Sequence, residues 1–165
     1  MKKALIAGSF DPITKGHVWM IEKARELFDD VIVAVAHNPQ KKSLLTVEER
    51  QLLIYASLDA HKLWNITMID ERDFTVTYAR DVGCTHIVRG IRNTTDFEFE
   101  HQLNLINREI SGDIETVYLM PPRELIEVSS SMVKSLMGLH GWEKIAGRYV
   151  TDPVLEMLRK KADVL

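Results

Sequence analysis

The chain has 165 residues, of which 45% are hydrophobic and 27% charged, and this composition predicts one globular domain spanning residues 1–165. A net charge of −3 excludes bulk attraction to nucleic acid or to an anionic membrane, so any anion site must be local. The lone cysteine, Cys84, excludes an intramolecular disulfide. Together with the absence of a signal-peptide pattern or an apolar run of membrane-spanning length, it favours a cytoplasmic protein.

The first motif follows an apolar run at residues 4–7 and precedes a helical pattern over residues 16–28. It reads Gly8-Ser9-Phe10-Asp11-Pro12-Ile13-Thr14-Lys15-Gly16-His17. The pattern predicts a buried strand, a tight loop and a helix N-terminus, where unpaired backbone N–H groups can bind an anion. The alternative interpretation is an ordinary strand-to-helix turn with a surface histidine.

Strand and helix patterns alternate along the rest of the chain. Further strands are predicted at residues 31–36, 66–69, 86–88 and 116–120. Thr46 with Glu49 predicts a capping box for a helix that extends to about Ala60, and Thr95 with Glu98 predicts one for a longer helix. That longer helix is expected to place its apolar side chains on one face, namely Phe99, Leu103, Ile106 and Ile110.

Shorter helices complete the pattern. One is predicted over residues 76–82 and another after the run Ser129-Ser130-Ser131. Asp152-Pro153 is typical of an N-cap and first turn, and it predicts a terminal helix that ends near Lys161. The alternation as a whole predicts an α/β fold with a doubly wound, five-stranded parallel sheet and C-terminal helices.

In such a sheet, ligands bind beyond the carboxyl ends of the strands, where the winding reverses. Four loops at these ends carry glycines, cations and hydroxyl groups, at residues 8–17, 38–42, 89–92 and 129–131. Their convergence would supply cations and hydrogen-bond donors but no nucleophile, which favours a polyphosphate site.

Each group also has a structural interpretation. Lys41-Lys42 can be a solvated loop pair, and the serine run can be a helix cap with spare hydroxyl groups. Arg89 and Arg92 can form ion pairs with the acidic residues between Asp96 and Glu100.

Other chemistries fit the sequence poorly. It contains no P-loop, no G-x-G-x-x-G after the first strand and no G-x-S-x-G. No metal-ligand spacing is visible among the remaining histidines, at positions 37, 61, 86, 101 and 140, so no protein residue is assigned to a metal.

The motifs in this order resemble those of the bacterial phosphopantetheine adenylyltransferases, a family of the H-x-G-H-type nucleotidyltransferases. Besides the first motif, the resemblance rests on Lys41-Lys42 with residues 45–50, on Arg89-Gly90-Ile91-Arg92, on residues 96–100 and on the serine run with Val133-Lys134. It covers residues 4–137 and implies a Rossmann-like nucleotidyltransferase fold.

The resemblance also implies a reaction: ATP and 4′-phosphopantetheine give dephospho-coenzyme A and pyrophosphate, the penultimate step of coenzyme A synthesis. Mg²⁺ is the implied cofactor and a homohexamer the implied assembly. Coenzyme A shares the pantetheine arm and is expected to compete as a feedback ligand. The alternatives are a related small nucleotidyltransferase with another phosphorylated acceptor, or a nucleotide-binding regulatory module without catalysis.

The implied site residues follow position by position. Those for ATP are Ser9, Phe10, His17, Gly90, Ile91, Arg92, Glu100, Leu125, Ile126, Glu127, Val128, Ser129, Ser130 and Ser131. Those for 4′-phosphopantetheine are Ser9, Lys41, Thr75, Arg89 and Asn107. The implied catalytic residues are His17, Lys41 and Arg92.

A phosphate nucleophile would attack the α-phosphorus in line, with no covalent enzyme intermediate. His17 is expected to donate to the α-phosphate, and Lys41 to bridge the α-phosphate and the nucleophile. Arg92 and the serines, with Mg²⁺, are expected to neutralise the leaving pyrophosphate.

Overall fold

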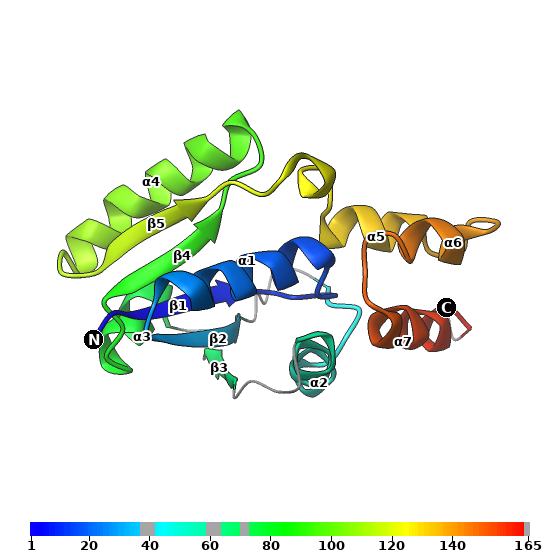
Figure 1. Cartoon of the computed structure of the whole chain (residues 1–165), viewed down its shortest axis with the longest axis horizontal. Helices are drawn as coiled ribbons and strands as arrows, with labels where there is room; N and C mark the ends of the chain where they lie inside the picture. The colour runs from blue at the N-terminus through cyan, green and yellow to red at the C-terminus, as the bar shows by residue number, and fades with distance from the viewer. Residues whose placement is uncertain (37–41, 59–63, 70–72, 164–165) are drawn as a thin grey trace.

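Apolar segments form the strands of one parallel sheet in the computed structural model, which describes residues 1–36, 42–58, 64–69 and 73–163 (Figure 1). The strands are β1 (Lys3–Gly8), β2 (Asp30–Ala36), β3 (Asn65–Ile69), β4 (His86–Gly90) and β5 (Glu115–Leu119). Their order is β3-β2-β1-β4-β5, and each neighbouring pair is parallel. The predicted five-stranded parallel sheet is confirmed.

Both faces of the sheet are buried. Side chains alternate along each strand, so each central strand contributes residues to a hydrophobic core on either face. Ala4 and Ile6 of β1 belong to one hydrophobic core, while Leu5 and Ala7 belong to the other. Helices α1 (Lys15–Leu27) and α2 (Val47–Ser57) contribute to the first core. Helices α3 (Thr75–Asp81) and α4 (Thr94–Ile110) contribute to the second, so the sheet is doubly wound.

The C-terminal end of α2 differs from the prediction. The Thr46–Glu49 capping box is present, but α2 ends at Ser57 rather than near Ala60. Leu58 takes an extended backbone, with φ −97° and ψ 162°, and its side chain is buried in the first core. Packing of that side chain ends the helix earlier than the sequence pattern indicated.

Helix α4 departs from the prediction in both its cap and its buried face. Asn93, and not Thr95 with Glu98, is the N-cap, and its side chain accepts a hydrogen bond from the Asp96 N–H at 2.8 Å. Of the expected apolar face, Phe99 and Ile106 are exposed, whereas Glu100 is buried. The buried face of α4 is polar because its acidic side chains bind arginines, as described below.

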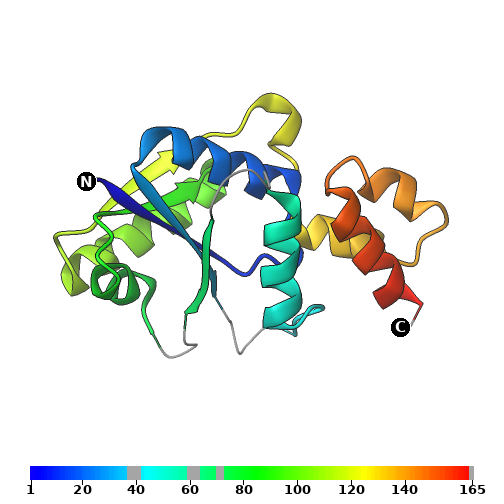
Figure 2. The ribbon, with the colours of Figure 1, turned by 60° about the horizontal axis from the view of Figure 1, so that its bottom comes forward.

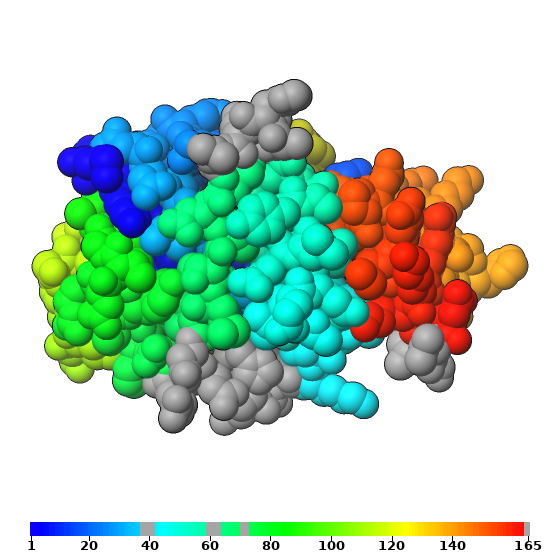
Figure 3. All heavy atoms as spheres, turned by 90° about the horizontal axis from the view of Figure 1, so that it is seen from below, coloured from blue at the N-terminus to red at the C-terminus, as the bar shows by residue number. Residues whose placement is uncertain are grey.

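The C-terminal segment extends beyond the sheet (Figure 2). It contains η1 (Arg123–Leu125), α5 (Ser130–Leu136), α6 (Trp142–Ala146) and α7 (Asp152–Ala162). Helix α7 lies against α2 (Figure 3), with Lys161 Nζ 2.7 Å from Glu49 Oε1 and Ser57 Oγ 2.7 Å from Thr151 Oγ1.

Two features of this segment were not predicted. The five-residue helix α6 begins after Gly141, whose φ of +72° suits glycine, and it is too short for a periodic pattern. The N-cap of α7 is Thr151, so the prediction of Asp152 was one residue late, and Pro153 lies in the first turn. No helix in the described part of the chain is long and apolar enough to cross a membrane.

Candidate active site

A cavity of about 520 Å³ opens beyond the carboxyl ends of β1 and β4, the two strands between which the winding reverses. It brings together three of the four predicted loops, and the fourth, residues 38–42, lies outside the described residues except for Lys42. The predicted site residues that line it are Ser9, Phe10, His17, Arg89, Gly90, Arg92, Glu100, Leu125, Val128, Ser129, Ser130 and Ser131.

The β1–α1 loop is shaped by Phe10, a non-glycine residue with a left-handed φ of 46°. Its ring is buried and meets the His17 ring edge-on, with centroids 5.2 Å apart. A Cβ at position 8 would lie 3.2 Å from the Phe10 ring, so Gly8 leaves the space that the ring needs. Phe10 therefore supports the imidazole at the cavity wall.

His17 is the third residue of α1 and completes its N-terminal cap. The Thr14 N–H donates to His17 Nδ1 at 3.1 Å, and Thr14 Oγ1 accepts from the His17 N–H at 3.5 Å. Because Nδ1 is an acceptor, the ring proton of the neutral form sits on Nε2. Burial, with the nearby charges of Arg92 and Arg89, lowers the pKa of His17 to about 4. His17 thus offers the cavity a neutral Nε2–H donor.

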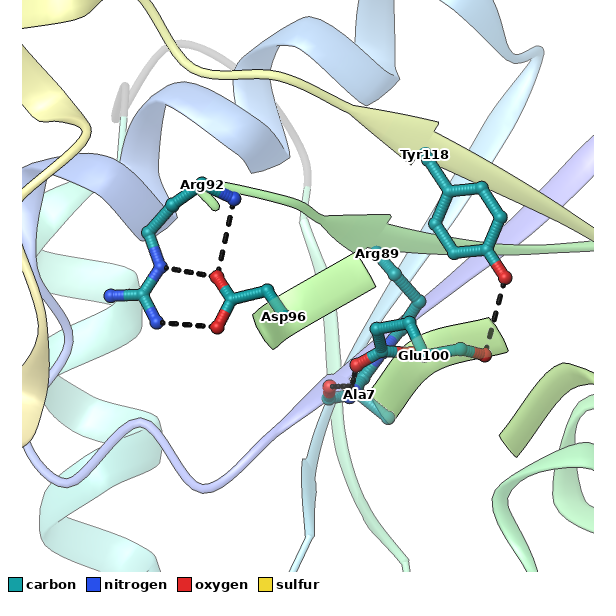
Figure 4. Close-up of polar contacts among 6 residues, drawn as sticks. All are labelled: Ala7, Arg89, Arg92, Asp96, Glu100 and Tyr118. Atoms are coloured by element: carbon teal, nitrogen blue, oxygen red, sulfur yellow. Dashed lines mark hydrogen bonds and ion pairs between the residues drawn. The ribbon is translucent and has the colours of Figure 1, made fainter. Parts of the chain in front are cut away.

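Two arginines, Arg89 at the end of β4 and Arg92 in the β4–α4 loop, are held by carboxylates of α4 (Figure 4). Arg89 Nε lies 2.9 Å from each carboxylate oxygen of Glu100, Arg89 Nη2 also donates to Glu100, and Arg89 Nη1 donates to the Ala7 carbonyl at 2.8 Å. Arg92 Nε and Nη2 donate to Asp96 at 2.9 and 3.3 Å, and Arg92 Nη1 donates to the Val128 carbonyl at 3.3 Å.

The ion pairing that the sequence left open is therefore present, and it does not remove the arginines from the cavity. Asp96 and Glu100 are four residues apart and share one face of α4, so they hold the two guanidinium groups side by side. Each guanidinium has five N–H donors and uses three in the contacts above. With respect to the described residues, two donors on each arginine remain for a ligand.

The serine run, Ser129 to Ser131, is both a helix cap and part of the cavity lining. Ser129 is the N-cap of α5 and accepts from the Met132 N–H at 3.1 Å. The Ser130 hydroxyl donates to the Pro12 carbonyl at 2.7 Å, which ties this helix start to the β1–α1 loop. With Ser131, both line the cavity.

A buried carboxylate, Asp11, fixes the loop from behind. It accepts from the Leu44 and Leu45 N–H groups at 3.0 and 2.9 Å and from Lys134 Nζ at 2.7 Å. Burial raises the pKa of Asp11, but the hydrogen bonds from Lys134 and the two N–H groups outweigh it and leave the pKa below its usual value. Asp11 is therefore an anchor between the loop, α5 and the segment before α2.

Several predicted residues lie apart from the cavity. Ile91 is buried beneath its edge, and Ile126 and Glu127 line a separate cavity of about 600 Å³ with Tyr149. Thr75 begins α3 and Asn107 lies in α4, and neither is among the lining residues. Lys41 lies outside the described residues.

Sequence reasoning assigned no role to Asp11, Lys134 or Trp19, of which Trp19 lines the cavity. Asp11 had a signal, since it is the one acidic residue in the first motif, but Lys134 is 123 residues away and only the fold reveals their pairing. Asp96 and Glu100 were noted for ion pairing, and their four-residue spacing on a helix is the signal that links them.

The oxygen donors at the cavity suit a metal ion that arrives on a ligand. Among the described residues, no three His, Cys, Asp or Glu side chains are grouped to hold a metal, and both cavity carboxylates bind arginines. Hydroxyl groups of the serines remain. Mg²⁺ commonly binds through substrate phosphates and water with few protein ligands, and this donor set fits that mode.

Sequence comparisons place the chain among nucleotidyltransferases. The family model described as cytidylyltransferase-like matches residues 5–136. The phosphopantetheine adenylyltransferase of Chromobacterium violaceum is 47% identical over 154 residues, which are 93% of this chain and 93% of that protein. The protein of the same name from Methylacidiphilum infernorum is 42% identical over 161 residues, covering 98% and 91%.

Structure comparisons find the same fold in more distant proteins. Plasmodium falciparum nicotinic acid mononucleotide adenylyltransferase, solved with NaAD, matches with a TM-score of 0.71 at 16% identity over 97% of this chain and 96% of that one. Thermotoga maritima TmcAL, bound with alpha-thio ATP, matches with a TM-score of 0.69 at 13% identity, covering 99% and 56%. At these identities the likeness shows the fold alone.

Proposed function

The chain belongs to the phosphopantetheine adenylyltransferase family, and from this premise we propose how its cavity joins ATP to 4′-phosphopantetheine. The enzyme transfers AMP from ATP to the phosphate of 4′-phosphopantetheine, which gives dephospho-coenzyme A and pyrophosphate. The family assigns the substrates, and the proposal concerns what each side chain does.

The observation that carries the proposal is the convergence of a neutral histidine donor with two arginines at one cavity. In the described part of the chain, Nε2–H of His17 and two donors of each arginine are available there, and no cysteine or lysine lines the cavity. Such a set binds phosphate and stabilises charge without forming a covalent intermediate.

The attacking group is the phosphate of the acceptor, which needs no base because its second pKa is about 6. It attacks the α-phosphorus of ATP in line and displaces pyrophosphate. His17 donates from Nε2 to the α-phosphate oxygens as negative charge develops on them. Arg92 and the serine hydroxyls bind the β- and γ-phosphates, and Lys41, outside the described residues, is proposed to bridge the nucleophile and the α-phosphate.

Arg89 is proposed to bind the acceptor phosphate. Glu100 and the Ala7 carbonyl fix the guanidinium, so its two remaining donors are preorganised. In this arrangement Glu100 positions Arg89, in addition to the ATP contact that the family implies for it. Ser9 lines the cavity together with His17 and both arginines, and its hydroxyl is proposed to contact the α-phosphate or the acceptor phosphate.

The hydroxyl groups of Ser129, Ser130 and Ser131 are proposed as the protein groups that would hold Mg²⁺ arriving with ATP. When bound, it supplies positive charge to the leaving pyrophosphate.

The single cysteine of the chain is free and buried, which is consistent with the proposed reducing environment of the cytoplasm.

A pyrophosphate-release assay with ATP, Mg²⁺ and a set of acceptors tests the function. We expect release with 4′-phosphopantetheine and none above background with pantetheine, nicotinamide mononucleotide or glycerol phosphate. Coenzyme A should raise the apparent KM for 4′-phosphopantetheine, because it carries the same arm. Equal turnover of unphosphorylated pantetheine would overturn the assignment, since that molecule lacks the nucleophile.

The homohexamer implied by the family is proposed to use exposed apolar side chains of α4. Phe97, Leu105 and Ile106 are 49%, 54% and 48% exposed along this one helix, which leaves apolar surface for an interface. Light scattering at micromolar concentration should give about six chain masses, and Ile106→Lys should lower the mass. A wild-type protein that stays monomeric contradicts the assembly but leaves the reaction unaffected.

A further inference from the structure

The cavity is lined by apolar as well as polar side chains. His17, Ser9 and the arginines are among its polar groups, described above. Its apolar lining comes largely from the second turn of α1, from α4 and from the segment after β5, and includes Trp19, Met20, Phe99, Pro121, Leu125 and Val128. A planar group attached to a polyphosphate has a natural place there.

Trp19 is the largest of these side chains, and packing of the protein interior does not account for it. Its neighbours Val18 and Met20 pack against the first hydrophobic core, but Trp19 belongs to neither core among the described residues. It is partly exposed and lines the cavity. A large aromatic surface that is left at a cavity wall is available to a ligand.

The position of Trp19 on α1 places it on the side of the helix that faces the segment after β5. A Cβ on Gly16 would lie 3.9 Å from both the Leu125 carbonyl and the Val128 Cβ, so the start of α1 faces residues 125–128. Trp19 is three residues after Gly16, hence on the same helix face and about one turn further on. It is also two residues, or about 3 Å along the helix axis, from His17.

We propose that Trp19 forms the wall against which the adenine ring of ATP packs, and so orients the α-phosphate toward His17. The inference rests on the proposed function, since it assumes that the phosphates of ATP bind at His17 and the arginines. Aromatic side chains bind bases through their π-faces, and truncation of such a side chain typically weakens binding by roughly 5- to 160-fold.

Calorimetry with Trp19→Ala and two ligands tests the wall directly. The affinity for ATP should fall on the order of tenfold, while the affinity for inorganic tripolyphosphate, which has no base, should stay within about twofold. Trp19→Phe keeps an aromatic face and should bind ATP within about threefold of wild type. Equal losses for ATP and tripolyphosphate, or no loss for ATP, would overturn the inference.

Fluorescence gives a second readout, because Trp19 is the only one of the three tryptophans, all described, that lines the cavity. ATP should change the emission of the wild type and of Trp64→Phe, but not that of Trp19→Phe. A full response in Trp19→Phe contradicts the proposal. If the wild type binds ATP but transfers no AMP, the proposed function fails and Trp19 remains a base contact; if it does not bind ATP, both fail.

Discussion

His17→Ala should lower kcat by roughly 10²–10³ and leave ATP binding close to that of the wild type. The Nε2–H of His17 is proposed to meet the α-phosphate oxygens, whose negative charge grows as the new bond forms. An interaction that strengthens in the transition state changes kcat, whereas one that is equal in both states changes only KM. Loss of one preorganised donor at developing charge costs about 3–4 kcal/mol.

The protonation state of His17 makes this expectation sharper. Because burial lowers its pKa to about 4, the imidazole of the free enzyme is neutral above that pH and loses its Nδ1 acceptor role only below it. Its ionisation should therefore not appear in a plot of kcat/KM between pH 5.5 and 8. A histidine that acted as the conjugate acid would instead lose activity as the pH rises through its pKa.

A matched variant separates the donor from the helix cap, since His17 also accepts from the Thr14 N–H. Asparagine can place an acceptor near the position of Nδ1 but has no atom at Nε2. His17→Asn should thus be as slow as His17→Ala in steady-state turnover with ATP and 4′-phosphopantetheine. Near-wild-type kcat in either variant would contradict a transition-state role, and recovery in His17→Asn alone would assign the effect to the cap.

The sequence predicted the sheet well because its strands are buried on both faces, so runs such as Val31 to Ala36 are continuously apolar. It also predicted which loops meet, since parallel strands bring their carboxyl ends to one edge. The positions of the helix caps were predicted less accurately. Thr95 with Glu98 fits the capping-box pattern as well as many real caps do, but the extended backbone belongs to Asn93.

The buried face of α4 could not be predicted from periodicity. Periodicity assigns apolar side chains to the buried face, whereas the structure buries Glu100, which pairs with Arg89. The same limit applies to long-range pairs. Nothing local in the sequence joins Asp11 to Lys134, or the buried Arg50 to the Ser9 carbonyl, which accepts from Arg50 Nη1 at 3.1 Å. Such contacts fix the loop and require the complete fold.

The Asp11 anchor should have a clear effect on stability. Asp11→Ala is expected to lower the free energy of unfolding by about 1–3 kcal/mol, the usual cost of leaving a buried polar group without its partner. The charge-assisted hydrogen bond with Lys134, whose side chain is one-third exposed, is lost with it. The buried Leu45 N–H also loses its acceptor, together with the half-buried Leu44 N–H. Urea unfolding measures the loss, with the exposed Glu26→Ala, which breaks the surface pair with Lys23, as the control within about 0.5 kcal/mol.

A double-mutant cycle then measures how much of the lost stability comes from the interaction between Asp11 and Lys134. In Lys134→Met the buried carboxylate keeps two N–H donors but loses its counterion, so this single change should also destabilise the fold. When Asp11 is already absent, Lys134, whose side chain is one-third exposed, can turn to water, and its removal should then cost little. The double variant should be more stable than the sum of the single changes indicates, by more than 1 kcal/mol. Additive losses would mean that Asp11 stabilises the loop through the Leu44 and Leu45 N–H groups alone, with no energetic link to α5.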